Sequence, residues 1–457
     1  MENLPAEILQ YICDFLDAMS QIIFRTINRL NYSVIRITDL YHIPEKYRRR
    51  LNDNILRKYQ YVKYLYSSRK ITDISYLTNL VELNAPLGTL IGDAQTLLLQ
   101  KLEKLVAKSN EHFIDINHLQ NLKILNISDN CMITNIGIQN CTNLIKLNIN
   151  HTNINNINHL VNLRELNCAG SSLVTEGCYK CTNLESIICT AFAKKTMLTE
   201  FNCFTNLRKL ITSSNEFIKN ENISQCLNLT ELDVSYTNIS DLNNLTNLQR
   251  LRVSGCEKLT HVGIERCVNL IKLQCYGSTN ITKINHLTKL EHLIINETCK
   301  ISEIEVNKCT TLKKLSVRSN KKIKNINYLT NLTTLEASGN SSGVTQNGIR
   351  ECTNLVKLKI DGNQNIKSVN HLQKLKYLYA QGICGIDDLG IKKCTKLVLL
   401  DLSYNIKVKN LNHLQDLKFL YACGRNCGVS DKGISECKSL IMIKANNNTK
   451  IKKKTVG

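Results

Sequence analysis

The sequence LTELDVSYTNISDLNNLTNLQRLRVSGCEKLTHVGIERCVNL, from Leu229 to Leu270, contains two consecutive copies of a repeating unit. Each copy opens with the pattern L-x-x-L-x-ϕ, where ϕ is an apolar residue, and the second ends with a Cys-x-x-Leu string. The string recurs at steps of 40, 45, 41, 42, 43, 42 and 43 residues. It stands at Cys141, Cys181, Cys226, Cys267, Cys309, Cys352, Cys394 and Cys437. Such regular recurrence predicts a repeat protein.

A second string, such as HLTKL at His286, lies midway between the cysteine strings and is followed by the same leucine pattern. Counting both kinds gives 18 unit starts that span 360 residues in 17 steps. They are Leu80, Leu102, Leu122, Leu144, Leu163, Leu184, Leu207, Leu229, Leu248, Leu270, Leu290, Leu312, Leu332, Leu355, Leu375, Leu397, Leu417 and Leu440. A looser unit begins near Val62. The spacing of about 21 residues is typical of leucine-rich repeats.

The pattern L-x-x-L-x-ϕ alternates apolar and outward-facing residues, as expected for a short strand with one buried face. One unit cannot bury that face alone, so neighbouring units must stack and their strands must form a curved parallel sheet. We therefore predict an α/β leucine-rich-repeat solenoid of about 18 units of about 21 residues. Short polar residues such as Asn130, Asn363 and Asn405 follow the strand directly, where they can hydrogen-bond the backbone of the turn.

The segment from Leu248 to Leu270 resembles the cysteine-containing leucine-rich repeats that are common in F-box proteins. The alternating unit from Leu229 to Leu248 resembles a shorter leucine-rich repeat that ends in an N-L-x-x-L step. The resemblance covers residues 62–447 and leaves residues 448–457 as a basic C-terminal tail. It implies the fold and gives no information about the ligand.

Residues 1–60 lack the repeat period and show a helical pattern instead. Pro5 suits the first turn of a helix, where its missing N–H has no cost. One apolar helix face is formed by Ile8, Leu9, Ile12, Phe15 and Leu16. A second helical pattern contains Ile23, Phe24, Ile27, Leu30 and Val34. Short helices of this kind need a partner or the first repeat to pack against.

The sequence LPAEILQYICDFLD (Leu4 to Asp17) resembles the start of an F-box, and FRTINRLNYSVI (Phe24 to Ile35) resembles its later part without the usual Trp. The resemblance implies an F-box-like helical module at 1–45, followed by a linker at 46–61. F-box segments bind the Skp-type adaptor of a cullin ubiquitin ligase, and the repeats behind them bind the target protein. Carried over by position, the adaptor-facing or box-core residues are Leu4, Pro5, Ile8, Leu9, Ile12, Phe15 and Leu16.

An alternative interpretation of the N-terminal helices needs no adaptor. Terminal units of a solenoid must cover its open apolar end, and a pair of short helices can do this. The chain would then be a protein-binding scaffold with a helical N-terminal cap and no connection to a ligase.

The composition is that of a folded, strongly basic chain. Of 457 residues, 43% are hydrophobic and 21% charged, and 59 Lys and Arg against 38 Asp and Glu give a net charge of +21. No apolar run approaches the roughly 18–20 residues of a membrane-spanning helix. The first residues, MENLPAEILQ, lack the features of a secretory signal. With 20 cysteines and no such signal, we expect free thiols, a cytoplasmic or nuclear location and no membrane association.

The abundance of Asn, Ile and Lys fits an AT-rich coding sequence, so part of the charge reflects codon bias and not an anionic partner. Together with the F-box-like module and the repeats, this composition resembles that of proteins of giant DNA viruses. The resemblance implies that the adaptor belongs to an infected host cell.

The cysteines and histidines predict structural roles. Cys178 and Cys181 form a C-x-x-C, but no second pair follows at zinc-finger spacing. Five of the ten histidines share one slot of the alternating unit: His118, His159, His286, His371 and His413. A catalytic group is needed once and not in every second coil. We find no hydrolase, zinc-protease or phosphate-loop motif, and therefore expect no enzyme activity, cofactor or metal.

The second, fourth and sixth residues after each starting leucine face the concave side of the predicted sheet. Across 18 units these 54 positions carry 12 Lys or Arg and 7 Asp or Glu, so most of the +21 lies elsewhere. A basic stretch is formed by Arg250, Arg252, Lys272, Lys314 and Arg318. It keeps a nucleic-acid ligand open as a third hypothesis, although such a binder usually concentrates its basic residues where the phosphates lie.

Aromatic residues are the most informative feature of that face. The predicted partner-binding residues are Tyr377, Tyr379, Leu399, Asp401, Phe419 and Tyr421, on three consecutive units. Exposed aromatic clusters of this kind are typical of protein-binding hot spots. The alternative is that these are ordinary strand tyrosines, which β-propensity favours.

Overall fold

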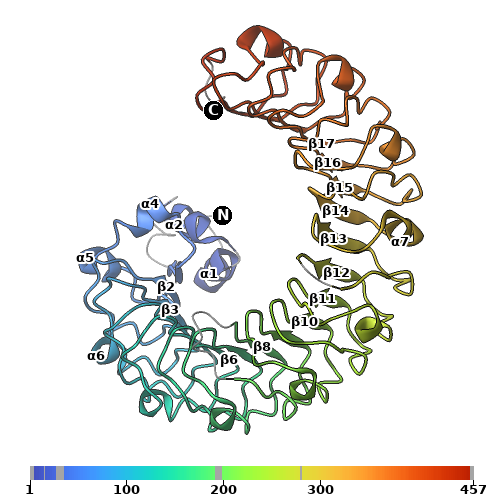
Figure 1. The fold of residues 1–457 in the computed structure, drawn as a ribbon. Helices are drawn as coiled ribbons and strands as arrows, with labels where there is room; N and C mark the ends of the chain where they lie inside the picture. The colour runs from blue at the N-terminus through green and yellow to red at the C-terminus, as the bar shows by residue number, and fades with distance from the viewer. Residues whose placement is uncertain (1–4, 15, 27–34, 191–197, 278–279, 453–457) are drawn as a thin grey trace. The chain divides into compact units, whose positions relative to one another are not determined.

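The computed structural model describes residues 5–14, 16–26, 35–190, 198–277 and 280–452. The chain divides into two compact units, Met1–Asn215 and Glu216–Gly457. In each unit the strands lie on the inner side of the coils, while helices such as α6 (Asp93–Thr96) and α7 (Glu303–Lys308) lie on the outer side (Figure 1). Each unit is therefore a leucine-rich-repeat solenoid with a parallel sheet along its concave face.

The first unit begins with helices α1 (Ala6–Asp14) and α2 (Ala18–Thr26) and continues with nine strands among its described residues. The strands are β1 (Asp39–Leu40), β2 (Tyr64–Tyr66), β3 (Glu82–Asn84), β4 (Lys104–Val106), β5 (Ile124–Asn126), β6 (Lys146–Asn148), β7 (Glu165–Asn167), β8 (Ser186–Ile188) and β9 (Lys209–Ile211). The returns contain α4 (Glu45–Arg48), α5 (Asp53–Leu56), α6, and the 3-10 turns η1 (Ile136–Ile138) and η2 (Thr175–Gly177). Leu83 lies opposite both Leu65 and Leu105 in the parallel ladder, so the leucines of successive coils stack.

The second unit contains eleven strands among its described residues. They are β10 (Glu231–Asp233), β11 (Arg250–Arg252), β12 (Lys272–Cys275), β13 (His292–Asn296), β14 (Lys314–Arg318), β15 (Thr334–Glu336), β16 (Lys357–Lys359), β17 (Tyr377–Tyr379), β18 (Leu399–Asp401), β19 (Phe419–Tyr421) and β20 (Met442–Lys444). The returns contain α7 and the turns η3 (Asn220–Asn222), η4 (Val262–Ile264), η5 (Asn347–Ile349), η6 (Leu389–Ile391) and η7 (Asp431–Ile434). The register is again in phase, with Leu251 opposite Leu232 and Leu273.

The predicted repeat pattern is confirmed. Each of the 18 predicted starts lies two residues before a strand of the series β3 to β20. The alternation of burial also follows the pattern, as in β11, where Arg250 and Arg252 are exposed on either side of a fully buried Leu251. The second residue after each starting leucine is accordingly exposed or partly exposed, whereas some fourth and sixth residues, such as Asp401 and Ser254, are buried.

The sheet begins earlier than the sequence pattern indicated. Strand β1 pairs in parallel with β2, with Asp39 opposite Tyr64, so a coil precedes the unit near Val62. The segment 46–61 was expected to be a linker, but it contains most of α4 and all of α5 and forms the return of that coil. The repeat pattern misses this coil because β1 has only two residues and no L-x-x-L motif. The limits of an adaptor-binding module at 1–45 remain a prediction.

Polar side chains close the turns between coils, as predicted. The Nδ2 of Asn130 donates to the carbonyl oxygens of Asn110 and Phe113, at 2.7 and 3.1 Å. Asn363, only 1% exposed, donates to Ala337 O at 3.1 Å. These amides satisfy backbone carbonyls inside the coil.

The substitution Asn363→Ala tests this role. It removes the donor to Ala337 O, Ser342 Oγ and Val344 O, which lie 3.1–3.2 Å away, and the acceptor for Asn365 N. Leaving these buried groups without a partner should lower the free energy of unfolding by about 2–4 kcal/mol. Urea unfolding followed by circular dichroism measures the change.

The matched control is Asn426→Ala, because this asparagine is exposed. Its effect should stay within about 0.5 kcal/mol. Equal losses for both variants would contradict a special role for the buried amide.

Candidate functional site

The described part of the N-terminal module exposes some predicted adaptor residues and buries others. Pro5 and Ile8 are exposed, Ile8 to 44%, whereas Leu9 is fully buried. The remaining predicted residues are Ile12 and Leu16, which are half-buried, and Leu4 and Phe15, which lie outside the described residues. Leu9 therefore belongs to the core of the module and cannot face a partner in this conformation.

Helices α1 and α2 are attached to the chain that leads into β1. Gln10 Oε1 accepts a hydrogen bond from Arg36 N at 2.6 Å, and Gln10 Nε2 donates to Arg36 O at 3.1 Å. The side chain of Gln21 is almost completely buried and accepts from Thr38 N at 3.4 Å. These contacts fix the helices at the start of the solenoid, as a cap requires.

The same helices leave an apolar surface uncovered. Tyr11 is 64% exposed and Ile23 is 57% exposed. Ile8 and Tyr11 are three residues apart and share one face of α1. Tyr11 does not stand out in the sequence, because its partial polarity removes it from a purely apolar helix pattern.

The predicted concave residues lie together on β17, β18 and β19, and we call them the aromatic patch. Tyr377 lies opposite Leu399, which lies opposite Phe419. Asp401 lies between Tyr379 and Tyr421 in the neighbouring row. The parallel register thus brings together residues about 20 positions apart in the chain.

The members of the patch differ in accessibility. Tyr377 is 37% exposed, and Tyr379, Leu399, Phe419 and Tyr421 are half-buried. Asp401 is only 8% exposed.

The carboxylate of Asp401 is engaged within the protein. It accepts from Gln381 Nε2 at 2.7 Å and from Ser403 N at 3.0 Å. Burial raises the pKa of Asp401. Asp401 therefore has a structural role within the patch. The aromatic and leucine side chains provide the surface that a partner can contact.

Two lysines border the patch and were not linked to it by the sequence pattern. The Nζ atoms of Lys357 and Lys359 both lie 5.3 Å from the centre of the Tyr379 ring. Burial raises the pKa of Tyr379, and the nearby Asp401 adds to this effect. Cation–π contacts of this kind hold the ring and place positive charge at the edge of the patch.

A basic row crosses four neighbouring strands of the second unit: Arg250 on β11, Lys272 on β12, His292 on β13 and Lys314 on β14. Arg252 and Arg318, on β11 and β14, complete the predicted basic stretch. Burial lowers the pKa of Lys272, and repulsion from Arg252 lowers it further. The row is partly neutralised, because Glu231 lies 4.0 Å from Arg250 and Asp233 lies 3.7 Å from Arg252.

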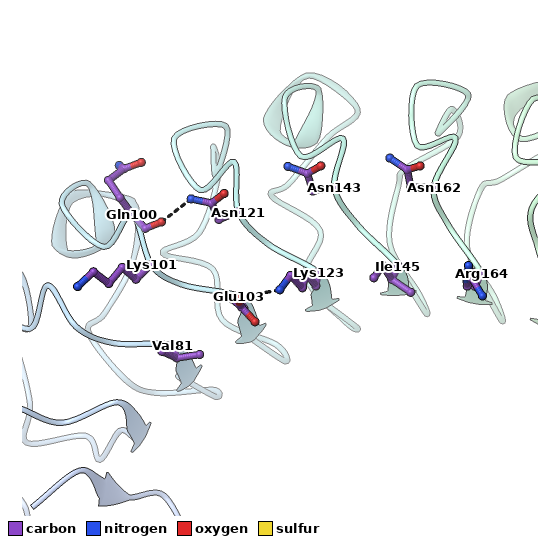
Figure 2. Close-up of a pocket in the computed structure, with 10 residues that line it drawn as sticks. All are labelled: Val81, Gln100, Lys101, Glu103, Asn121, Lys123, Asn143, Ile145, Asn162 and Arg164. Atoms are coloured by element: carbon purple, nitrogen blue, oxygen red, sulfur yellow. Dashed lines mark hydrogen bonds and ion pairs between the residues drawn. The ribbon is translucent and has the colours of Figure 1, made fainter.

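A groove of about 670 Å³ runs along the N-terminal ends of strands in the first unit, and Figure 2 shows its ten lining residues. Asn143 and Asn162 donate to carbonyl oxygens of the preceding coil, at 2.9 and 3.2 Å. Lys123 Nζ donates to Glu103 Oε1 at 2.8 Å (Figure 2). The polar groups that line the groove thus hold neighbouring coils together, and we assign no chemistry to them.

The recurrent cysteines form a ladder of weak hydrogen bonds. Cys181 Sγ donates to Ile157 O at 3.3 Å, and Cys437 Sγ donates to Leu411 O at 3.1 Å. Burial raises the pKa of Cys141, Cys181, Cys267 and Cys352 to about 12 and that of Cys309, Cys394 and Cys437 to about 11. Thiols in this state are poor nucleophiles and poor metal ligands.

The recurrent histidines form a second ladder. The Nε2 atoms of His159, His371 and His413 each lie 3.1 Å from a carbonyl oxygen of the preceding coil. A carbonyl only accepts, so Nε2 carries the proton. Burial lowers the pKa of His159, which favours this neutral form. The structural role predicted for these histidines agrees with this geometry.

The described residues, 5–14, 16–26, 35–190, 198–277 and 280–452, contain neither a metal-binding cluster nor a membrane-spanning helix. No group of three or more His, Cys, Asp or Glu side chains in them is arranged to hold a metal ion. No helix within the same ranges has the length and apolar character needed to cross a membrane.

Comparison with solved structures agrees with the fold. The TLR13 of a TLR13–ssRNA13 complex matches at 18% identity over 92% of this chain and 69% of that chain, with a TM-score of 0.55. An internalin, inlF, from Listeria monocytogenes str. 4b F2365 matches at 24% identity over 63% and 82%, with a TM-score of 0.45. The leucine-rich-repeat protein LIC12759 of Leptospira interrogans matches at 19% identity over 82% and 93%, with a TM-score of 0.43.

At these identities the likeness concerns the fold alone. A scan of the sequence against protein-family models finds no match. A search of curated proteins also finds no significant match.

The burial of the thiols predicts their reactivity. Of the 20 cysteines, Cys131 is exposed, Cys203 and Cys423 are partly exposed, and the other 17 are buried. In the native protein at pH 8, an aromatic disulfide reagent should modify Cys131 rapidly and Cys203 and Cys423 slowly. The others should react only after unfolding.

The control is Cys131→Ser, which should abolish the rapid phase without affecting the slow one. Rapid modification of the ladder cysteines in the folded protein would contradict their structural role.

Proposed function

We propose that the chain is the substrate-recognition subunit of a cullin-type ubiquitin ligase. The supporting observation is the combination of an F-box-like sequence with the exposed Pro5, Ile8 and Ile23, directly before a leucine-rich-repeat array. In this proposal α1 and α2 bind the Skp-type adaptor, and the concave face of the repeats binds a target protein.

The mechanism is proximity, and the chain performs no chemistry itself. The adaptor connects the N-terminal helices to the cullin, and the repeats hold the target so that one of its lysines meets a ligase-bound ubiquitin. Binding both partners at once raises the effective concentration of that lysine near the ubiquitin.

The aromatic patch is the proposed target-binding surface. Its aromatic rings lie on rigid parallel strands, so little conformational entropy is lost when a partner covers them. Tyr and Phe side chains on such a surface contribute large apolar areas, as hot-spot residues do.

The alternative is a protein-binding scaffold whose helices only cap the solenoid. The hydrogen bonds between Gln10 and Arg36 support a cap. A cap alone, however, does not account for the exposure of Ile8, Tyr11 and Ile23. Docking on one side of the helices and capping on the other are compatible.

The proposal names a protein target and not a nucleic acid. Two arginines of the basic stretch already have carboxylates within 4.0 Å, from Glu231 and Asp233. The aromatic patch, on the other hand, lies on strands of its own, beyond β14. At the patch, Lys357 and Lys359 already lie against the face of the Tyr379 ring, where a base would have to stack.

The substitution Ile8→Asp tests the adaptor interaction. Because Ile8 is 44% exposed, the variant should keep its stability within about 1 kcal/mol but fail to recover adaptor and cullin from a eukaryotic lysate. Quantitative mass spectrometry of the captured proteins gives the readout, and thermal unfolding verifies the fold.

Two controls accompany this variant. Ile136→Asp changes a residue of the repeats that is 72% exposed, and adaptor recovery should stay unchanged. Leu9→Asp changes a fully buried residue and should destabilise the module. If folded Ile8→Asp recovers as much adaptor as the unmodified chain, the ligase proposal is wrong.

The double substitution Tyr377→Ala with Phe419→Ala tests the aromatic patch. Loss of two hot-spot rings should reduce recovery of the target at least tenfold, while adaptor recovery stays constant as an internal reference. Tyr328→Ala is the control, since Tyr328 is 67% exposed in a turn of the same unit. If every captured protein persists in the double variant, the patch is not the target site.

A further inference from the structure

Much of the positive charge of the chain lies in one short segment of the first unit. Residues 46–70 contain nine Lys or Arg and one Asp, a net charge of 9 − 1 = +8 out of +21 for the whole chain. The structure places this segment in α4, α5, β2 and the turn after β2. The concave rows of the repeats therefore do not account for most of the charge.

Part of this segment lines a pocket of about 590 Å³. Its basic residues are Arg48 from α4, Arg49 directly after α4, and Arg69 and Lys70 from the turn after β2. The only carboxylate in the lining is Glu45, and Arg49 Nε already donates to it at 3.1 Å. The pocket thus contains three basic side chains without a carboxylate of their own in its lining.

The guanidinium of Arg48 is held in place within the pocket. Its central carbon lies 4.2 Å from the centre of the Tyr66 ring, a cation–π contact that orients the planar group. The Nε of Arg48 is buried, yet it has no hydrogen-bond acceptor among the residues that the structure describes. Because Nε has almost no accessible surface, a ligand would bind the terminal amino groups of Arg48, which is partly exposed and has no ion pair among the described residues.

The turn that carries Gly88 allows Arg69 to reach the same pocket. Gly88 has φ +80°, and a Cβ at this position would lie 2.8 Å from Arg69 Nε. Glycine is favoured by this backbone conformation. Arg69 is exposed, and its side chain passes close to the turn.

The serine and threonine hydroxyl groups of the pocket already donate within the protein. Ser67 Oγ donates to Ser68 O at 3.3 Å, Ser68 Oγ to Leu51 O at 2.6 Å, and Thr89 Oγ1 to Pro86 O at 2.9 Å. The basic side chains are consequently the main donors for a ligand. The lining also contains the apolar residues Pro86 and Leu87, and Leu87 is 61% exposed.

We propose that this pocket binds the phosphoryl group of a phosphorylated side chain in a partner protein. Clustered arginines are the usual recognition element for a phosphate dianion, because the guanidinium fork matches its oxygens. Leu87 would contact the residue next to the phosphorylated one. The proposal rests on the proposed function only in assuming that the chain binds a partner protein.

The geometry favours a single phosphoryl group over a nucleic acid. The basic side chains converge in one bounded hollow and do not follow a track. The Tyr66 ring, which could stack on a base, has Arg48 over its face. Binding of single-stranded nucleic acid needs open aromatic faces along a groove.

Fluorescence anisotropy of the full-length chain with labelled degenerate peptides tests the proposal. The peptides carry a fixed central phosphoserine, serine or glutamate between random residues. We expect the phosphoserine peptides to bind at least tenfold more tightly than the other two, and phenyl phosphate to displace them. An oligo-uridylate of matched length is the nucleic-acid probe.

The variant Arg48→Ala with Arg69→Ala should lose at least tenfold in affinity for the phosphoserine peptides. The control Arg350→Ala with Arg425→Ala removes the same charge from exposed positions of the second unit and should bind unchanged. Tyr66→Leu keeps the net charge but removes the support of Arg48, and should also weaken binding. Thermal unfolding establishes that each variant is folded.

Equal binding of the glutamate peptides, or equal losses in the two double variants, would show a nonspecific charge effect and overturn the proposal. Tighter binding of oligo-uridylate through Arg48 and Arg69 would replace it with a nucleic-acid site. Because the measurement contains neither adaptor nor cullin, its outcome is independent of the ligase proposal. Phosphopeptide binding would survive even if Ile8→Asp left adaptor recovery unchanged.

Discussion

The hydrogen bonding of the backbone between coils is the constraint on which the rest of the structure depends. Each coil turns away from its short strand, so its N–H and C=O groups cannot all join the sheet ladder and must find other partners. Asn117 shows the solution: its Nδ2 donates to Ile136 O at 2.7 Å, and its Oδ1 accepts from Asn140 N at 2.7 Å. Asn158, Asn243, Asn327, Asn370 and Asn412 make the same pair of contacts. The asparagine-rich composition therefore has a structural use, whatever its origin in codon bias.

Because of these side-chain ladders, the residues that stabilise the fold and the residues that can contact a partner occupy different positions of each repeat. Leucines, asparagines, cysteines and histidines at fixed slots hold each coil to the next, and these slots differ from the outward positions of the strands. The outward positions can then vary without loss of fold, from basic at Arg250 to aromatic at Tyr377. A solenoid built in this way carries its specificity in a few strand positions, as repeat proteins generally do.

The repeats were predictable from sequence because one pattern recurs in 18 units. Alignment of the units with one another fixes the start of each unit, even where a single unit departs from the pattern. The same register predicts that Tyr377, Leu399 and Phe419 lie side by side, as they do in the structure. Features set by a single contact were not predictable. The burial of Asp401 depends on Gln381, the opposite exposure of Ile8 and Leu9 depends on how α1 packs, and β1 is too short to show a period. The pocket at Arg48 was missed because its residues come from three separate segments.

The N-terminal end of the first unit combines three features in one place. It closes the apolar end of the solenoid through Gln10 and Gln21, exposes Ile8 and Ile23, and gathers a net charge of +8 within residues 46–70. A cap needs the first feature only. Apolar exposure costs solubility, and clustered like charges repel one another, so both features are destabilising unless a partner covers or neutralises them. This destabilisation is concentrated where the repeat pattern stops. It is the physical reason for proposing partner binding at this end as well as on the concave face.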